Sequence, residues 1–361
     1  MKRIILTGGG TAGHVTPNIA LIPELQKRDF EIHYIGSKTG IEKELISNFD
    51  IPYYGISSGK LRRYFDVKNF TDPFRILKGF SEAVKLMKEI KPDVVFSKGG
   101  FVTVPVVKAA SHRKIPCVLH ESDISPGLAN RLCISSATAI CANFPETVEH
   151  LPEDKAYLTG TPIRGELFSG NRLNGLDFCG FTANKPVILV IGGSLGSVRV
   201  NEAVREILPQ LLENYQVIHL CGKEKIDESL QGTEGYVQFE YIQKELCDLL
   251  DAADLVISRA GANAICELLA LRKPNILIPL SLAASRGDQI LNANSFEKQG
   301  FSYVIKEEEL TGQGLLDAVQ HMSEKKEEYR ATMANSDQQD AVIKVADLIE
   351  KVCNNEENSD S

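Results

Sequence analysis

The sequence predicts an α/β protein of two Rossmann-like domains, whose parallel sheets face each other across a cleft. Its 361 residues suit two domains of about 150 residues better than one large core. Short apolar, β-rich runs alternate with longer segments of helical period, as expected where helices connect parallel strands. A buried strand that runs into a glycine-rich turn and then a helix occurs twice, about half a chain apart.

The first half of the chain holds five predicted strands, and the first of them ends in a glycine-rich turn. The strands are residues 3–7, 31–35, 93–97, 116–120 and 137–141. The turn places Gly8, Gly10 and Gly13 at the spacing of a dinucleotide-binding fingerprint. Such a site also needs an acidic residue at the end of the second strand, where this chain has YIGS at residues 34–37. We therefore predict that the turn does not bind a nicotinamide cofactor.

The second half repeats this arrangement. Its predicted strands are residues 187–191, 216–220, 254–258, 275–278 and 303–305. The first of them runs into a second glycine-rich turn, GGSLG at residues 192–196. The N-terminus of a helix presents unpaired N–H groups and the positive end of its dipole. Both turns are therefore predicted to be anion sites.

The boundary between the domains is predicted at residues 160–165, where glycines and Pro162 interrupt the pattern. The first domain is therefore predicted to end at residue 163, and the second is predicted to begin at residue 164. Residues 341–352 predict an amphipathic helix, with Val342, Val345, Ala346 and Ile349 along one face. The polar, acidic residues 354–361 predict a disordered tail.

Composition excludes several classes of function. The net charge of −8 provides no global field for nucleic acid. The apolar run after Met1 is too short for an export signal, and no apolar stretch approaches the roughly 18 residues of a membrane-spanning helix. The eight cysteines form no C-x-x-C pair and are expected to be buried, reduced thiols of a cytoplasmic protein. No D-x-D motif and no His/Cys cluster with metal spacing occurs, so we expect no metal.

A segment of the first half combines positive charge with aromatic residues. Residues 60–91 carry nine Lys and Arg against four Asp and Glu. Large apolar side chains are interleaved with them, including Phe74, Leu77 and Phe80. Such a surface suits anionic lipid headgroups, although the same aromatics would also suit an ordinary core.

Four polar side chains near predicted strand ends are candidates for chemistry. His14 lies in the first glycine-rich turn, where an imidazole with a pKa near neutrality suits a general base; the alternative is a structural histidine. Glu267 lies in an otherwise apolar stretch and would accept hydrogen bonds from ribose hydroxyls, unless it is a solvated surface carboxylate. Gln289 follows a predicted strand and offers both an amide donor and an acceptor to a sugar. Arg164, at the predicted domain boundary, would neutralise a diphosphate.

Several motifs in order along the chain strongly resemble the MurG family of UDP-N-acetylglucosamine transferases, from residue 3 to about residue 350. They are GGGTAGHVTP at 8–17, KGGFV at 98–102, HESD at 120–123, PGLAN at 126–130, GTPIR at 160–164, GGSLG at 192–196 and residues 259–267. The resemblance implies a GT-B fold in which the C-terminal helix returns to the first domain. The N-terminal domain would then comprise residues 1–163 together with 341–361, and the C-terminal domain would comprise residues 164–340. The resemblance also implies an inverting, metal-independent transfer of GlcNAc from UDP-GlcNAc to the C4 hydroxyl of MurNAc in lipid I, which gives lipid II for peptidoglycan synthesis.

The resemblance also assigns residues to roles. It implies an acceptor-binding, membrane-facing N-terminal domain and a UDP-GlcNAc-binding C-terminal domain, on the cytoplasmic face of the membrane beside anionic lipids and other cell-wall synthesis proteins. The implied donor-binding residues are Thr11, Ala12, Gly13, Arg164, Ser194, Ile242 (through its backbone), Gly261, Ala262, Asn263, Ala264, Glu267 and Gln289. The implied acceptor-binding residues are Thr11, His14, His120, Asp123 and Asn130, and the implied membrane residues are Phe74, Leu77 and Phe80.

Two positions depart from the family pattern. Asp123 stands where the family often has Asn, and Ile290 stands where it often has a second Gln. The catalytic base is therefore either His14 or Asp123. Two other functions would suit a double-Rossmann chain: a UDP-GlcNAc 2-epimerase, or a non-catalytic membrane adaptor that binds a nucleotide sugar.

Overall fold

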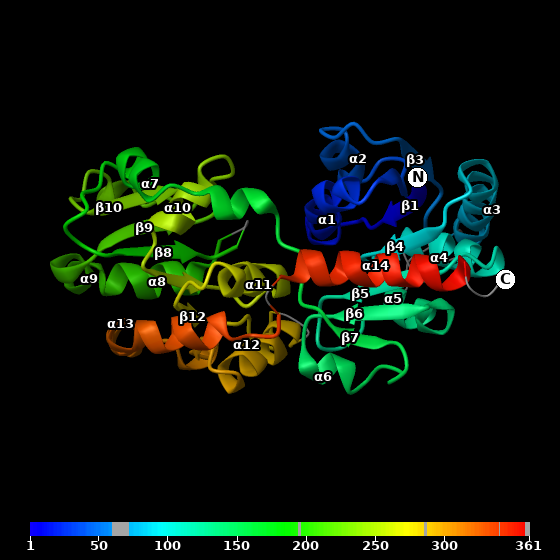
Figure 1. The fold of residues 1–361 in the computed structure, drawn as a ribbon. Helices are drawn as coiled ribbons and strands as arrows, with labels where there is room; N and C mark the ends of the chain where they lie inside the picture. The colour runs from blue at the N-terminus through cyan, green and yellow to red at the C-terminus, as the bar shows by residue number, and fades with distance from the viewer. Residues whose placement is uncertain (60–71, 194–195, 285–286, 339, 358–361) are drawn as a thin grey trace. The chain divides into compact units, whose positions relative to one another are not determined.

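The computed structural model describes residues 1–357 except 60–71, 194–195, 285–286 and 339. The chain forms two compact units (Figure 1). Unit 1 comprises Met1–Arg164 and Asp337–Ser361, and unit 2 comprises Gly165–Ser336. Each is an α/β unit with a parallel sheet, so the predicted fold class is confirmed.

Unit 1 is built on a seven-stranded parallel sheet with the strand order β3-β2-β1-β4-β5-β6-β7. The strands are β1 (Lys2–Thr7), β2 (Phe30–Ser37), β3 (Tyr53–Ile56), β4 (Val94–Ser97), β5 (Cys117–Glu121), β6 (Ala139–Ala142) and β7 (Ala156–Leu158). The helices are α1 (Thr16–Lys27), α2 (Ile41–Ile46), α3 (Asp72–Ile90), α4 (Thr103–His112), α5 (Leu128–Cys133), α6 (Pro145–Val148) and α14 (Ala341–Glu357).

Alternate residues of the central strands of unit 1 enter two different hydrophobic clusters, because successive side chains of a strand point to opposite faces. Ile4 and Leu6 of β1 pack with apolar residues of α1 and α14. Ile5 packs with α3 and α4 on the other face. The sheet is therefore covered on both faces, and α14 supplies one of the covering helices.

Unit 2 is built on a six-stranded parallel sheet with the order β10-β9-β8-β11-β12-β13. The strands are β8 (Val187–Ile191), β9 (Gln216–Leu220), β10 (Tyr236–Phe239), β11 (Leu255–Ser258), β12 (Asn275–Leu277) and β13 (Tyr303–Val304). The helices are α7 (Arg172–Cys179), α8 (Val198–Glu206), α9 (Leu208–Asn214), α10 (Leu246–Ala252), α11 (Ala262–Ala270), α12 (Asp288–Lys298) and α13 (Gly312–Ala334).

The two sheets share one topology around their central strands. In each unit the chain moves outward from the first strand, β1 or β8, and then crosses back to pair β4 or β11 on its other side. The carboxyl end of the first strand is thus the point at which the strand order reverses, where α/β proteins bind ligands. Both glycine-rich turns lie there, with left-handed backbone at Gly10 (φ +89°) and Gly193 (φ +87°).

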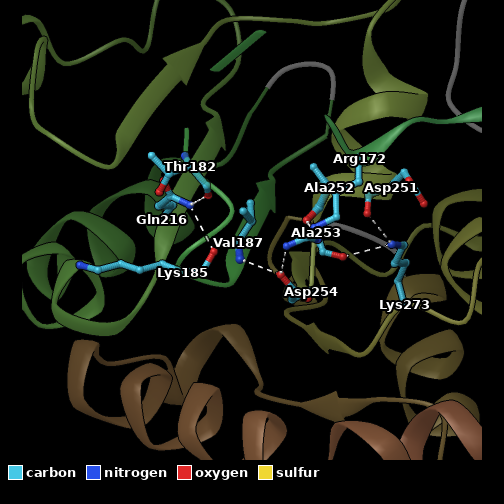
Figure 2. Close-up of polar contacts among 10 residues, drawn as sticks. All are labelled: Arg172, Thr182, Lys185, Val187, Gln216, Asp251, Ala252, Ala253, Asp254 and Lys273. Atoms are coloured by element: carbon cyan, nitrogen blue, oxygen red, sulfur yellow. Dashed lines mark hydrogen bonds and ion pairs between the residues drawn. The ribbon is translucent and has the colours of Figure 1, made fainter. Parts of the chain in front are cut away.

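The opposite, amino ends of the first strands are held by an aspartate in each unit. The Asp93 carboxylate accepts a hydrogen bond from the Arg3 backbone N–H (2.6 Å), and the Asp254 carboxylate accepts one from the Val187 N–H (2.9 Å). Figure 2 shows the second of these, together with Arg172, which also donates to Asp254 (3.0 Å). In both units, therefore, an aspartate of the protein itself pairs with a backbone N–H group at the amino end of the first strand.

Three strands of the structure were not predicted, and all three are edge strands. They are β3 and β7 at the two edges of the first sheet and β10 at an edge of the second. Edge strands are only half covered, so their residues need not form the continuous apolar run by which a buried parallel strand is recognised. In β7, for example, Tyr157 is exposed between two half-buried neighbours.

The prediction of the chain's end needs one correction. The amphipathic helix at residues 341–352 is confirmed, and its side chains Val345, Ala346 and Ile349 are buried in unit 1. The disordered tail predicted from residue 354 is wrong for residues 354–357, because α14 continues to Glu357. Burial of Val352 and Cys353 in the same cluster holds the helix up to this point.

Candidate active site

Unit 2 contains a cavity at the carboxyl ends of β8, β9 and β11. Its volume is about 140 Å³. It brings together three of the residues predicted to bind the donor, Ile242, Ala264 and Glu267. The complete lining is Ile191, Gly193, Leu220, Glu240, Tyr241, Ile242, Leu246, Leu250, Ser258, Ala264, Glu267 and Leu268.

The helix α11 places the carboxylate of Glu267 at this cavity. The helix begins directly after Gly261, and Ile265, Cys266, Leu268 and Leu269 bury its inner face in unit 2. Glu267 itself is half-buried beside these apolar residues. The surroundings suit a carboxylate that accepts hydrogen bonds from a ligand's hydroxyls better than a fully solvated surface charge.

The other predicted donor residues that the structure describes lie outside the lining of this cavity, in several parts of the chain. Residues 261–263 are half-buried at the start of α11. The Gln289 side-chain oxygen accepts a hydrogen bond from the Leu280 N–H (3.1 Å), which orients its amide group. Arg164 is the last residue of the first segment of unit 1 and is half-buried, and Ser194 lies outside the described residues.

A buried ion pair that the motif analysis did not identify stabilises the loops around this edge of unit 2. The Arg259 guanidinium contacts the Glu307 carboxylate, and only 8% and 9% of the two residues are exposed. Arg259 also donates to the Ser197 hydroxyl (2.6 Å), which caps α8 after the glycine-rich turn. Glu307 also accepts from the Ser281 N–H (3.0 Å). The pair thus ties the turn after β8 to the loop after β12.

We predict that Glu307→Ala lowers the free energy of unfolding by about 3–5 kcal/mol, because it leaves the Arg259 charge buried without its partner. Burial opposes ionisation of Glu307, but the hydrogen bonds from Arg259 and Ser281 outweigh it and lower the Glu307 pKa. The stabilisation is therefore complete above pH about 4.5 and is lost as the pH falls through the lowered pKa. Urea unfolding at pH 7 measures the loss. The control is Glu309→Ala, whose ion pair with Lys306 is solvent-exposed and should contribute little to stability; equal losses in the two variants would contradict the prediction.

In unit 1, a short 3-10 helix (Ala12–His14) positions His14 after the first glycine-rich turn. The imidazole Nδ1 lies 3.2 Å from the Gly9 carbonyl oxygen and 3.1 Å from the Thr11 hydroxyl. We assign the ring proton to Nδ1, because the Gly9 carbonyl can only accept. Nε2 then carries the lone pair that can take up a proton.

The surroundings of His14 keep its ring neutral. Partial burial lowers its pKa to about 4, with a further contribution from the Lys98 ammonium; the Gly9 hydrogen bond and the Glu42 carboxylate act in the opposite direction. At neutral pH the imidazole is thus unprotonated and its lone pair is available to a proton. The pKa near neutrality expected from the sequence is wrong, because burial and Lys98 make the ring a weaker base than an ordinary imidazole.

Two predicted acceptor residues of unit 1 are engaged inside the fold. His120 is fully buried, its Nε2 lies 2.9 Å from the Gly160 carbonyl oxygen, and burial holds its pKa well below the ordinary value. The Asn130 amide donates to the His120 carbonyl (3.1 Å) and to the Glu121 carboxylate (2.9 Å). These hydrogen bonds fix both side chains at the carboxyl end of β5.

Asp123 is half-buried in the loop after β5. Like His14, which follows β1, it lies at the carboxyl ends of the strands of this sheet. Its backbone N–H donates to the Glu121 carboxylate (3.0 Å), and its carbonyl accepts from the Thr147 hydroxyl (3.2 Å). The Gly127 N–H donates to Glu121 as well (2.9 Å). Glu121, which belongs to the motif HESD but was not among the predicted site residues, therefore fixes the loop that presents Asp123.

Lys98 is a second residue that the site predictions missed. It follows β4 directly, is 1% exposed, and donates to the Ser122 hydroxyl. Its position in the motif KGGFV, directly after a buried strand, is the signal that marks it in the sequence. Among the residues that the structure describes, no group of three or more His, Cys, Asp or Glu side chains is arranged to hold a metal ion.

Comparison with known proteins defines first the class of the chain. The N-terminal domain of glycosyltransferase family 28 matches residues 4–142, and its C-terminal domain matches residues 187–352. The UDP-N-acetylglucosamine--N-acetylmuramyl-(pentapeptide) pyrophosphoryl-undecaprenol N-acetylglucosamine transferase of Lachnoclostridium phytofermentans is 68% identical over 98% of this chain and 99% of its own length. The Lachnospira eligens protein of the same name is 62% identical over 97% and 99%. The chain belongs to this family of N-acetylglucosamine transferases.

Solved structures agree with this assignment of the fold. The crystal structure of Acinetobacter baumannii MurG matches with a TM-score of 0.75 and 26% identity, over 97% of this chain and 100% of that one. The UDP-GlcNAc 2-epimerase of Neisseria meningitidis, bound to UDP-GlcNAc, matches with a TM-score of 0.65 but 16% identity, over 97% and 100%. The second likeness shows a shared fold alone.

Proposed function

We propose that the chain transfers GlcNAc from UDP-GlcNAc to the C4 hydroxyl of MurNAc in lipid I, with inversion at the anomeric carbon. The observation that carries the proposal is the 68% identity, over nearly the whole length, to a transferase named for this reaction. The structure supports it with a cavity beside Glu267 in unit 2 and a neutral imidazole at a strand end in unit 1.

In this proposal unit 2 binds the donor. Glu267 accepts hydrogen bonds from the ribose hydroxyls, the Ile242 backbone contacts the base, and Gln289 contacts the sugar. Residues 261–264, Ser194 and Arg164 hold the diphosphate, whose charge is balanced by helix N-termini and the guanidinium rather than by a metal. Thr11, Ala12 and Gly13 of unit 1 contact the donor from the first turn.

Unit 1 supplies the acceptor site and the base. The Nε2 atom of His14 removes the proton of the acceptor C4 hydroxyl while that oxygen attacks the anomeric carbon of GlcNAc. The new C1–O4 bond forms as the bond between C1 and the UDP oxygen breaks, and UDP leaves with that electron pair. In this proposal Asp123 contacts a sugar hydroxyl, and it is the alternative base.

A test with sugar-labelled UDP-GlcNAc separates this function from the epimerase. We expect label in the lipid fraction only when lipid I is added, and an unchanged nucleotide sugar without it. Label converted to UDP-N-acetylmannosamine without any acceptor would instead identify an epimerase. Binding of UDP-GlcNAc without either product would identify an adaptor.

We further propose that α3 attaches the protein to the cytoplasmic face of the membrane. In this helix 75% of Phe74 and 65% of Leu77 are exposed, three residues apart and next to the cations Arg75 and Lys78. Phe80, by contrast, packs against the core of unit 1. No helix in the described part of the chain is long and apolar enough to cross a membrane. The basic residues 60–68 of the same predicted surface lie outside the described residues.

We predict that Phe74→Ser with Leu77→Ser lowers partitioning onto anionic vesicles by at least about tenfold, since burial of each large apolar side chain contributes about 1.5–3 kcal/mol. Binding of the unmodified protein should also weaken with salt, which screens exposed charges over about 8 Å at physiological ionic strength. Vesicle sedimentation measures both effects. The matched control is Leu173→Ser, since this side chain is 69% exposed on unit 2. Partitioning that stays unaltered in the double variant would place the membrane surface elsewhere.

A further inference from the structure

A buried carboxylate lies directly against the backbone of the first glycine-rich turn. Glu42 lies in the first turn of α2 and is fully buried. Its Oε2 accepts a hydrogen bond from the Gly10 N–H (3.2 Å). Its Oε1 accepts from the Ser37 N–H (2.9 Å) and from the Ser37 hydroxyl (2.5 Å). One carboxylate thus joins the end of β1 to the end of β2.

Two glycines are needed so that this carboxylate can approach. A Cβ atom at Gly9 would lie 2.6 Å from the carboxylate carbon of Glu42, and one at Gly40 would lie 2.2 Å from Oε2. Both distances are far shorter than van der Waals contact. Gly9 in the turn and Gly40 before α2 therefore make room for an anion, but this anion belongs to the protein itself.

Two tyrosines hold the backbone near this carboxylate, one holding it in the turn and one at the end of β2. The Tyr34 hydroxyl donates to the Gly8 carbonyl (2.8 Å), and the Tyr53 hydroxyl donates to the Ser37 carbonyl. The backbone is thus fixed at Gly8 and at Gly10, on either side of Gly9, whose carbonyl oxygen faces the His14 ring.

We infer that Glu42 is a positioning residue for His14: its carboxylate takes the place of a ligand phosphate in the first turn and fixes the Gly9 carbonyl that selects the His14 tautomer. The inference rests on the proposed role of His14 as base. It also changes the expectation of two equivalent anion sites, because the Gly10 N–H in the first turn already binds Glu42. The negative charge there disfavours a dinucleotide diphosphate, in agreement with the sequence-based argument against a nicotinamide cofactor.

The test uses Glu42→Gln, which keeps the shape of the side chain. Its amide NH₂ must face the N–H group of either Gly10 or Ser37, so one of these hydrogen bonds is replaced by a contact between two donors. We expect kcat to fall by about 100-fold, the loss typical of a displaced catalytic group, with unchanged UDP affinity. The matched control is Glu44→Gln, an exposed residue on the same helix, which should behave as the unmodified protein.

Nitrogen NMR of the histidine ring provides a readout that a merely structural role would not change. The His14 signals, assigned by their absence from His14→Gln, should show protonated Nδ1 in the unmodified protein and a mixture of tautomers in Glu42→Gln. An unchanged tautomer in Glu42→Gln, with or without a loss of kcat, would overturn the inference.

Two further outcomes are distinguishable. If the unmodified protein shows no transfer but the tautomer still depends on Glu42, the proposed function fails while the positioning role stands. If Glu42→Gln does not fold, Ser37→Ala takes its place, since it removes one donor to the carboxylate and keeps the other two. It should shift the tautomer and kcat in the same direction by less, and wild-type values for both would overturn the inference.

Discussion

Replacing His14 with alanine is expected to lower kcat by about 10²- to 10⁴-fold, the contribution of a well-positioned general base. UDP affinity should not change, because the proposed donor contacts of Glu267 and Ile242 lie in unit 2. Steady-state kinetics with lipid I, together with calorimetry of UDP binding, measure the two quantities. Because burial lowers the His14 pKa to about 4, the ring is unprotonated at neutral pH and takes up a proton only as the pH falls towards that value. The rate should therefore show no loss from His14 protonation between pH 6 and about pH 8.

Asp123→Asn is the comparison that decides between the two candidate bases. A residue that only contacts a sugar hydroxyl should cost less when its charge is removed, since the amide still forms hydrogen bonds. If Asp123→Asn abolishes turnover while His14→Ala retains most of it, the carboxylate is the base and the role assigned to His14 is wrong.

Replacing Glu267 with alanine is expected to weaken UDP binding by about 10- to 150-fold. This corresponds to roughly 1.5–3 kcal/mol for the loss of hydrogen bonds from ligand hydroxyls to a charged acceptor. The half-buried position of Glu267 at the cavity of unit 2 is the structural basis of the expectation. Isothermal titration calorimetry with UDP measures the affinity directly.

The control for this substitution is Glu213→Ala, which removes an exposed glutamate of α9 in the same unit. It should bind UDP as the unmodified protein does. Unchanged UDP affinity in a folded Glu267→Ala variant would remove Glu267 from the donor site.

The central part of the fold could be predicted because buried parallel strands carry a local signal. Strand β8 is a continuous apolar run, and β9 is fully buried although it includes Gln216 and His219; the predicted bounds of both match those in the structure. Edge strands such as β3 carry no such run, since only one of its four residues is buried. Their positions depend on pairing with a distant strand, which a local pattern does not contain.

The candidate site was predictable to a similar extent. Glu267 and His14 were identifiable because each is a polar residue in an apolar or glycine-rich setting near a strand end. Glu42 and Glu121 were not, because their significance comes from contacts with the turns and strand ends of the folded unit. Glu42, for example, looks like an ordinary charged residue of a short helix until Gly10 and Ser37 are seen to donate to it. Lys98 carries a signal in KGGFV, directly after a buried strand, that the site prediction did not use.

The configuration of the bond that the enzyme forms tests the account most directly. A base such as His14 or Asp123 that activates the acceptor hydroxyl for attack opposite the departing UDP produces a single displacement, which inverts the anomeric carbon. Proton NMR of the disaccharide formed from α-linked UDP-GlcNAc and lipid I distinguishes the two configurations by the coupling between H1 and H2. We predict a β linkage from GlcNAc to O4 of MurNAc; an α linkage would contradict the single displacement and the role of the base.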